Sequence, residues 1–280
     1  MCIMVCNVRE LIDEVVVDRP RLENAPLKAV ICQVRFPRQL DLGDADVRPI
    51  QQALAKRYPV LVEETAAELT VEAGPSPKAF FAPGRQQTIY RFRDADEKWT
   101  ATVGPEAISL ETTAYVGMRD LLTRWAELVA QAQVSLALGA QSRLGLRYVN
   151  EVACPGRTRP ELSGWVREEL VSLIGAHDSR TADLIRLVSQ AQFRQPEGAT
   201  CNFRHGLAAD PEDESRAIFL LDLDYFREEI LDFDLERQIR MLASFNEGAC
   251  EMFAWTFPPE TREDFGPEVP VEPTPSLEEQ

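Results

Sequence analysis

Hydrophobic and polar residues alternate along several short stretches of the chain, and elsewhere apolar residues recur every three or four positions. Residues 29–36 show the first pattern, which is typical of a β-strand because successive side chains point to opposite faces. Val30, Cys32 and Val34 would share one face, while Arg35 lies on the other. Similar alternation predicts further strands at residues 88–93, 98–103, 107–112, 143–152, 184–193, 199–207 and 216–225.

Helical spacing of apolar residues predicts two long amphipathic helices, at residues 116–137 and 232–255. A shorter helix is expected to begin at Asp46, whose carboxylate can cap it. Pro160 is expected to open another helix, in which Leu162 to Ile174 supply the apolar face.

The predicted elements follow the same order in both halves of the chain: a strand, a helix, several antiparallel strands and a long helix. We therefore expect an α+β fold in which two pseudo-repeated lobes form one extended sheet with helices on one face. The order resembles the TATA-binding-protein type of fold as an architectural analogy. The expected parts are an N-terminal extension (1–22), a first lobe (23–140), a second lobe (141–258) and a disordered tail (259–280). The tail is expected because this segment is acidic and rich in proline, although Phe265 could dock on the core.

Four segments carry a resemblance to a known family. They are Asn-Ala-Pro-Leu with Val-Arg-Phe in residues 24–36, Ser-Leu-Glu-Thr-Thr-Ala-Tyr in 109–115, Arg-Leu-Gly-Leu-Arg-Tyr-Val-Asn in 143–150, and Leu-Asp-Leu-Asp in 221–224. In this order and spacing they resemble a sporadically distributed bacterial family of uncharacterised proteins of about this length, over residues 22 to 266. The resemblance implies no activity, cofactor or catalytic residue, and the family's patchy occurrence suggests a role linked to mobile elements or defence.

Charge narrows the range of partners. The 280 residues contain 30 Lys and Arg against 46 Asp and Glu, so the formal net charge is 30 − 46 = −16. Nucleic-acid binders and proteins that dock on anionic membranes rely on clustered cations. We therefore expect neither a nucleic acid nor a membrane as the partner, while the oligomeric state stays open.

The remaining composition favours a cytoplasmic protein. No apolar run reaches the length of a membrane span, and the start of the chain lacks the features of a secretory signal. The six cysteines are scattered without any C-x-x-C pair, so neither zinc binding nor a disulfide framework is expected.

The usual catalytic and nucleotide-binding motifs are missing, and any histidine-dependent mechanism would have to use one of the chain's two histidines. His177 follows a predicted helix and fits a turn or a cap. His205 lies four residues after Cys201 on a predicted strand, which allows a Cys–His dyad or two metal ligands; an ordinary half-buried histidine is the favoured interpretation. The sequence predicts no catalytic residue, no metal site and no cofactor.

Charged side chains gather on the strand positions opposite the more apolar face. The candidate ligand-binding residues are Arg35, Arg91, Arg93, Arg143, Arg147, Asp222 and Asp224, with Glu151 on the same surface. They could form cross-strand salt bridges, or they could line a surface for an anionic ligand. Asp222 and Asp224 could also bind Mg²⁺ or divide acid and base roles.

Two functions remain after these exclusions. The leading hypothesis is a non-enzymatic protein-binding module that engages a protein partner through its helix-free sheet face or its acidic surface. The alternative is a small-anion or nucleotide-binding protein, or an enzyme, that uses the arginine-lined sheet face with Asp222 and Asp224.

Overall fold

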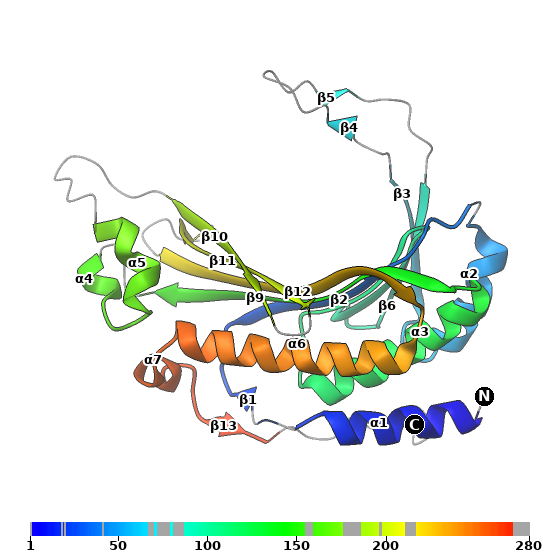
Figure 1. Ribbon diagram of the computed structural model, residues 1–280, viewed down its shortest axis with the longest axis horizontal. Coiled ribbons are helices and arrows are strands. Elements are labelled where there is room, and N and C mark those ends of the chain that lie inside the picture. Colours follow the sequence, from blue (N-terminus) through cyan, green and yellow to red (C-terminus); the bar gives the residue numbers. More distant parts are fainter. Residues whose placement is uncertain are drawn as a thin grey trace.

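The structure is a computed structural model with an α+β architecture, as expected: one large antiparallel sheet with helices packed on one face (Figure 1). It describes residues 2–17, 19, 21–40, 42–66, 70–71, 79–80, 87–154, 159–175, 186–195, 198–210 and 217–270. His177 lies outside these residues, as does most of the segment between the third and sixth strands.

In the described residues, nine strands form the large sheet in the order β10-β11-β12-β9-β2-β8-β7-β6-β3. These strands are β2 (Leu27–Arg35), β3 (Val60–Ala66), β6 (Gln87–Arg93), β7 (Trp99–Val103), β8 (Ala107–Thr112), β9 (Ala140–Cys154), β10 (Leu187–Arg194), β11 (Thr200–Ala209) and β12 (Ala217–Asp232). At the centre, β2 and β9 run antiparallel with Cys32 opposite Leu146. The two short strands β4 (Thr70–Val71) and β5 (Ala79–Phe80) pair separately.

Two long helices, α3 (Met118–Ser135) and α6 (Leu235–Thr256), pack against each other beneath one face of the sheet (Figure 1). Helix α1 (Cys2–Val15) lies across both on the outside and makes a third layer. Helix α2 (Asp44–Leu54) packs on α3. The shorter helices are α4 (Arg159–Leu162), α5 (Glu168–Gly175) and α7 (Pro259–Glu263).

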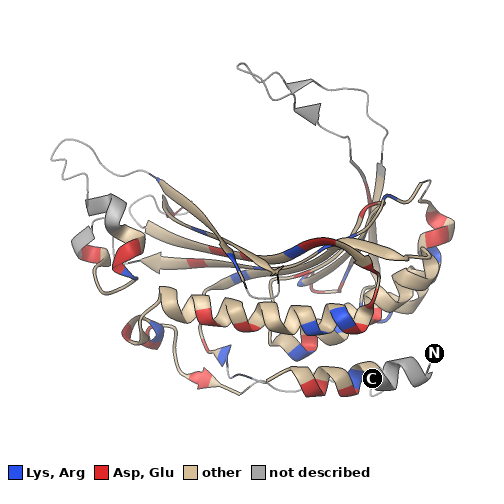
Figure 2. Ribbon diagram, in the orientation of Figure 1, with Lys and Arg blue, Asp and Glu red and all other residues tan. Residues whose placement is uncertain are grey.

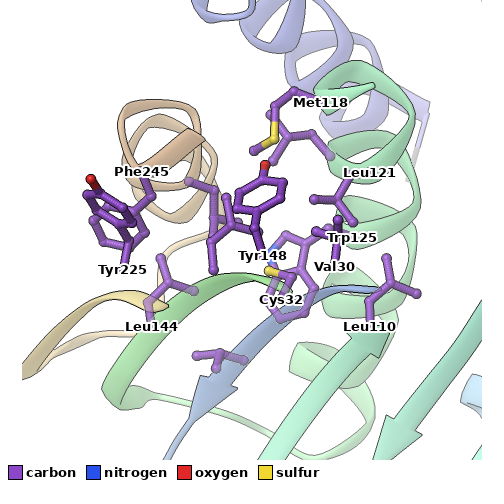
Figure 3. Close-up of a cluster of buried hydrophobic side chains, with 14 of the residues drawn as sticks. Val30, Cys32, Leu110, Met118, Leu121, Trp125, Leu144, Tyr148, Tyr225 and Phe245 are labelled. Atoms are coloured by element: carbon purple, nitrogen blue, oxygen red, sulfur yellow. The ribbon is translucent and has the colours of Figure 1, made fainter. Parts of the chain in front are cut away.

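The core lies between the sheet and the pair α3–α6. Alternation along β2 turns Val30 and Cys32 towards the helices (Figure 3), and Val34 follows the same pattern; all three are fully buried. Trp125 of α3 is also fully buried, and its indole N–H donates to Oε1 of Gln238 on α6 at 3.1 Å. The Gln238 amide in turn donates to Oε1 of Gln141 on β9 at 2.9 Å, so one buried polar chain connects both helices to the sheet.

Two predicted helices differ from the observed ones. Helix α2 begins earlier than expected, with Gly43 at its N-cap, and the Asp46 carboxylate accepts a hydrogen bond from the Gly43 backbone N–H at 3.0 Å. The helix expected from Pro160 is divided into α4 and α5. Gly164 lies between them with a φ of +79°, a conformation that a continuous right-handed helix does not contain.

The segment after α6 does not fit a disordered tail that starts at residue 259. Helix α7 forms there, and Phe265 is buried against Phe253 and Phe257 with ring centroids 6.1 and 5.5 Å away. Strand β13 (Glu268–Val269) then pairs with β1 (Arg21–Leu22), and we call this two-stranded unit the β1–β13 ribbon. One large aromatic side chain thus holds in place a segment whose composition favours disorder.

We find no helix in the described part of the chain with both the length and the apolar character that a membrane crossing needs.

Candidate functional site

The sheet has two different faces. One is covered by α3 and α6, and over the described residues no helix packs on the other, which we call the open face (Figure 1). Both ends of the sheet curve away from α6, so the open face is concave. A concave surface on a rigid sheet is a suitable place for a partner or a ligand.

Charged residues occur along several strands of the sheet (Figure 2). Every predicted candidate lies at a position that alternates with buried core residues: Arg35 on β2, Arg91 and Arg93 on β6, Arg143 and Arg147 on β9, and Asp222 and Asp224 on β12. The strand pattern therefore predicted which face these residues share. The structure adds which of them meet.

Arg147 and Asp222 form the tightest pair at the centre of the open face. Arg147 Nε donates to Asp222 Oδ1 at 2.7 Å and Nη2 donates to Oδ2 at 2.8 Å, which is the bidentate geometry that suits a guanidinium and a carboxylate. Arg204 of β11 adds a longer contact to the same carboxylate, at 3.4 Å. The hydrogen bond to Asp222 raises the pKa of the Arg147 guanidinium above its ordinary value.

Arg143 reaches its carboxylate by lying along the surface of the sheet. Its Nη2 donates to both carboxylate oxygens of Asp224 at 3.1 Å, and its guanidinium carbon lies 4.6 Å from the centre of the Phe226 ring. Gly145 leaves the room for this path, because a Cβ at that position would come within 2.7 Å of Arg143 Nη1. Asn202 donates to the same carboxylate at 3.3 Å. We call Arg143, Arg147, Arg204, Asp222 and Asp224 the central ladder.

The other candidates lie apart from the central ladder. Arg91 pairs with Glu64 of β3 at 3.1 Å, and Arg93 pairs with Glu97 at 3.4 Å. Arg35 stands opposite Arg143 in the β2–β9 register, and its Nε donates to the Gln33 amide oxygen at 3.1 Å.

Glu151 contacts Lys28 at 3.8 Å on the same face. The face therefore carries the cross-strand ion pairs that the sequence offered as one alternative, and its charges are largely matched.

In the described residues, no group of three or more His, Cys, Asp or Glu side chains is arranged to hold a metal ion. The carboxylates of Asp222 and Asp224 each accept hydrogen bonds from an arginine, so neither is available as a metal ligand or a free base without breaking an ion pair.

His205 and Cys201 lie on the covered face of β11, deeper than the half-buried position expected for the histidine. His205 is 8 % exposed, and its ring stacks on Phe219 with centroids 6.0 Å apart. Burial lowers the pKa of His205 and raises the pKa of the Cys201 thiol to about 11. The Cys201 thiol resists deprotonation and the His205 imidazole is neutral and enclosed, so the two residues are part of the core and do not form a nucleophilic pair.

Sequence patterns did not reveal a cavity of about 640 Å³ on the covered side. It lies between α6, the first residues of β2 and the loop that precedes α3, and the β1–β13 ribbon borders it. Tyr148, which points from β9 into the space between α3 and α6 (Figure 3), donates to Asn246 Oδ1 at 2.7 Å. Tyr115 approaches both groups at 3.5 Å. Periodicity marks Tyr148 as a core residue, but it cannot show where the core is left unfilled.

Comparisons with protein-family models, with curated proteins and with solved structures find no match for this chain.

Proposed function

We propose that this protein is a non-enzymatic binding module whose open face docks a folded protein partner. The observation that carries the proposal is the central ladder, a set of matched, prearranged charges in the middle of a concave surface without helices. Bidentate pairs fix the direction of each charged group, and complementary charge patterns give protein interfaces their specificity.

Matched charges favour a protein over a phosphate-rich partner. Arg143 and Arg147 already bind carboxylates, and a phosphate would have to displace Asp224 and Asp222 while leaving those anions beside it. The chain's net charge of −16 adds long-range repulsion. Carboxylates on a protein surface can instead pair with the exposed edges of Arg147 and Arg204, whose side chains are each 40 % exposed.

The proposal extends to the origin and location of the protein. We assign it to the sporadically distributed bacterial family on the four motifs of the sequence, with a role in a mobile-element or defence locus. We further place it in the cytoplasm. The unbridged, buried thiols of Cys32 and Cys201 support a reducing compartment.

We also propose that the two halves of the sheet are a structural repeat. In the first half, β2 is followed by α2 and by a meander that ends in β8, which pairs with β2. In the second half, β9 is followed by α4 and α5 and by a meander that ends in β12, which pairs with β9. The antiparallel contact of β2 with β9 would then join the two units edge to edge.

Two matched substitutions test the docking face. Ser109 lies on β8 at the middle of the open face, opposite Gln33 and Thr102, whereas Ser244 is exposed on α6 on the far side. Ser109→Arg and Ser244→Arg add the same side chain to opposite faces. Tagged wild-type and variant proteins are recovered from the native host at native levels, and the bound proteins are quantified by mass spectrometry.

We expect one polypeptide to be recovered in stoichiometric amount with the wild-type chain and with Ser244→Arg, and to be lost with Ser109→Arg. Recovery of the wild-type chain alone would contradict the proposal. So would a partner that Ser109→Arg retains, because a bulky cation in the middle of the face cannot be tolerated by a partner that covers it. Thermal unfolding of both variants confirms that they are folded.

One observation favours a small-anion site as a second candidate. Arg35, which donates to an amide, stands beside Arg143 in the β2–β9 register, so two arginines occupy adjoining positions at one edge of the central ladder. A thermal-shift screen with nucleotides and divalent cations tests this candidate, since ligand at a hundred times its Kd stabilises a protein by about 2.7 kcal/mol. A shift that persists in Arg35→Ala and Arg143→Ala contradicts the assignment.

A further inference from the structure

We propose that the cavity beside α6 is a binding site for an amphipathic organic acid, with the carboxylate at Arg262 and the apolar body inside the protein. This site is separate from the open face, and it does not depend on the proposed docking function. The volume of about 640 Å³ falls within the range of small-molecule sites.

The lining is suited to a molecule with a large apolar part. The apolar wall includes Val16, Leu22, Leu27, Met118, Leu223 and Phe253, which come from helices, strands and the β1–β13 ribbon. The free energy of the system falls when an apolar group replaces poorly bound water in a cavity of this kind.

The charges at the cavity favour an anion. Four cations contribute to its lining, Arg19, Arg21, Lys28 and Arg262, against two anions, Glu23 and Glu268, a local balance of 4 − 2 = +2 in an acidic protein. Lys28 is engaged by Glu151 on the open-face side.

Arg262 supplies the most specific signal. Its Nε is buried, yet no atom in the described part of the chain accepts a hydrogen bond from it. A buried donor without an acceptor costs free energy, and a guanidinium is built to hold a carboxylate through two N–H groups. A carboxylate in the cavity would bring an acceptor to this guanidinium, and a shift of the Arg262 side chain would then expose the buried Nε to it.

A second polar group lies within the cavity. Asn246 Oδ1 accepts hydrogen bonds from Tyr148 at 2.7 Å and from Tyr115 at 3.5 Å. Burial raises the pKa of both tyrosine hydroxyls, so both remain neutral donors. Neutral hydroxyls add a place for a second polar atom of the ligand without repelling its carboxylate.

The test uses decanoate and its neutral analogue 1-decanol, measured by isothermal titration calorimetry on the full chain. Arg262→Gln removes the proposed carboxylate partner and keeps a polar side chain, whereas Arg262→Lys restores the charge. Arg240→Gln is the matched control, because Arg240 lies on α6 outside the cavity, where it pairs with Glu14. Ala254→Phe fills the cavity from α6.

We expect one decanoate to bind per chain, at least tenfold more weakly in Arg262→Gln than in the wild type, with recovery in Arg262→Lys. Binding of 1-decanol should be the same in wild type and Arg262→Gln, and Ala254→Phe should abolish both. Arg240→Gln should behave as the wild type does. If decanoate does not bind, if it binds no better than 1-decanol, or if its binding survives Ala254→Phe, the proposal is overturned. These outcomes leave the docking test untouched, because that test reports on the other face of the sheet.

Discussion

Strand β9 shows the difference between the two faces of the sheet within a single segment. Leu144 and Leu146 point to α3 and α6 and are fully buried, whereas Arg143 and Arg147 point the other way and bind carboxylates. Apolar contacts on the covered face lose their favourable free energy if they are exposed. Ion pairs on the open face can be exchanged for others of similar energy. One face therefore maintains the fold, whereas contacts on the other can change with little loss of stability.

The largest contrast is expected from truncating side chains on the two faces of β9. Leu146→Ala removes methyl groups from a fully buried position and should lower the free energy of unfolding by about 2–5 kcal/mol. Val149→Ala, at a half-buried position on the open face of the same strand, should cost about 1 kcal/mol or less. Urea unfolding measures both, and equal losses would contradict the division of roles between the faces.

The next effect concerns amides on the two faces. Gln238→Ala leaves the Trp125 indole N–H and the Gln141 amide oxygen without their partners in a dry core, which should cost about 1–3 kcal/mol. Gln192→Ala removes one amide contact to Asn202 on the open face, where water can replace it, and should change stability by no more than about 0.5 kcal/mol. Thermal unfolding compares them, and Trp125 fluorescence should change only in Gln238→Ala.

A smaller effect is expected from the central ladder itself. Asp222→Asn weakens the contacts of Arg147 and Arg204, but both arginines are 40 % exposed and can be hydrated, so the loss of stability should be about 1 kcal/mol. A double-mutant cycle with Arg147→Ala isolates the pair, and its coupling energy should shrink as salt is added. A coupling that does not respond to salt would mean that the pair is part of the core.

The smallest effect is a pH dependence from the covered face. Burial lowers the pKa of His205 below its ordinary value of 6.5, so the unfolded chain takes up a proton at a higher pH than the folded one. Stability should therefore fall as the pH is lowered through 6.5 and towards the folded pKa. His205→Gln should reduce this slope in denaturant titrations at several pH values, and His177→Asn accounts for the chain's second histidine. An unchanged slope in His205→Gln would show that His205 is not responsible.

Period-two alternation predicted every strand of the described nine-stranded sheet except β3, and it predicted the face that each charged candidate occupies. This prediction succeeded because one face is apolar and the other polar along β2, β9 and β12. The sequence of each strand therefore indicates which of its side chains face the core. The pairing of Arg143 with Asp224 could not be predicted, since it depends on strand register and on the space left above Gly145. The sequence thus predicted correctly that cross-strand ion pairs form on this face, but only the structure shows which arginine binds which carboxylate.

The errors have equally specific causes. Proline and acidic residues favoured disorder after residue 258, but Phe265 gains enough contact with Phe253 and Phe257 to hold α7 in place. The interrupted helix at Gly164 reflects one residue's conformation within an otherwise apolar pattern. The cavity escaped prediction because a void arises from how distant segments meet, and no single segment carries its signature.

The β1–β13 ribbon joins positions 21 and 269, a separation of 269 − 21 = 248 residues, through very few backbone hydrogen bonds. The amides of Glu23 and Asn24 extend it by donating to Pro267 and Phe265. So small a unit opens at much lower free energy than the sheet, and hydrogen exchange at Glu23 and Asn24 should be faster than at Cys32 and Val34. Because the ribbon borders the cavity, its local opening would widen the cavity while the nine-stranded sheet stays intact.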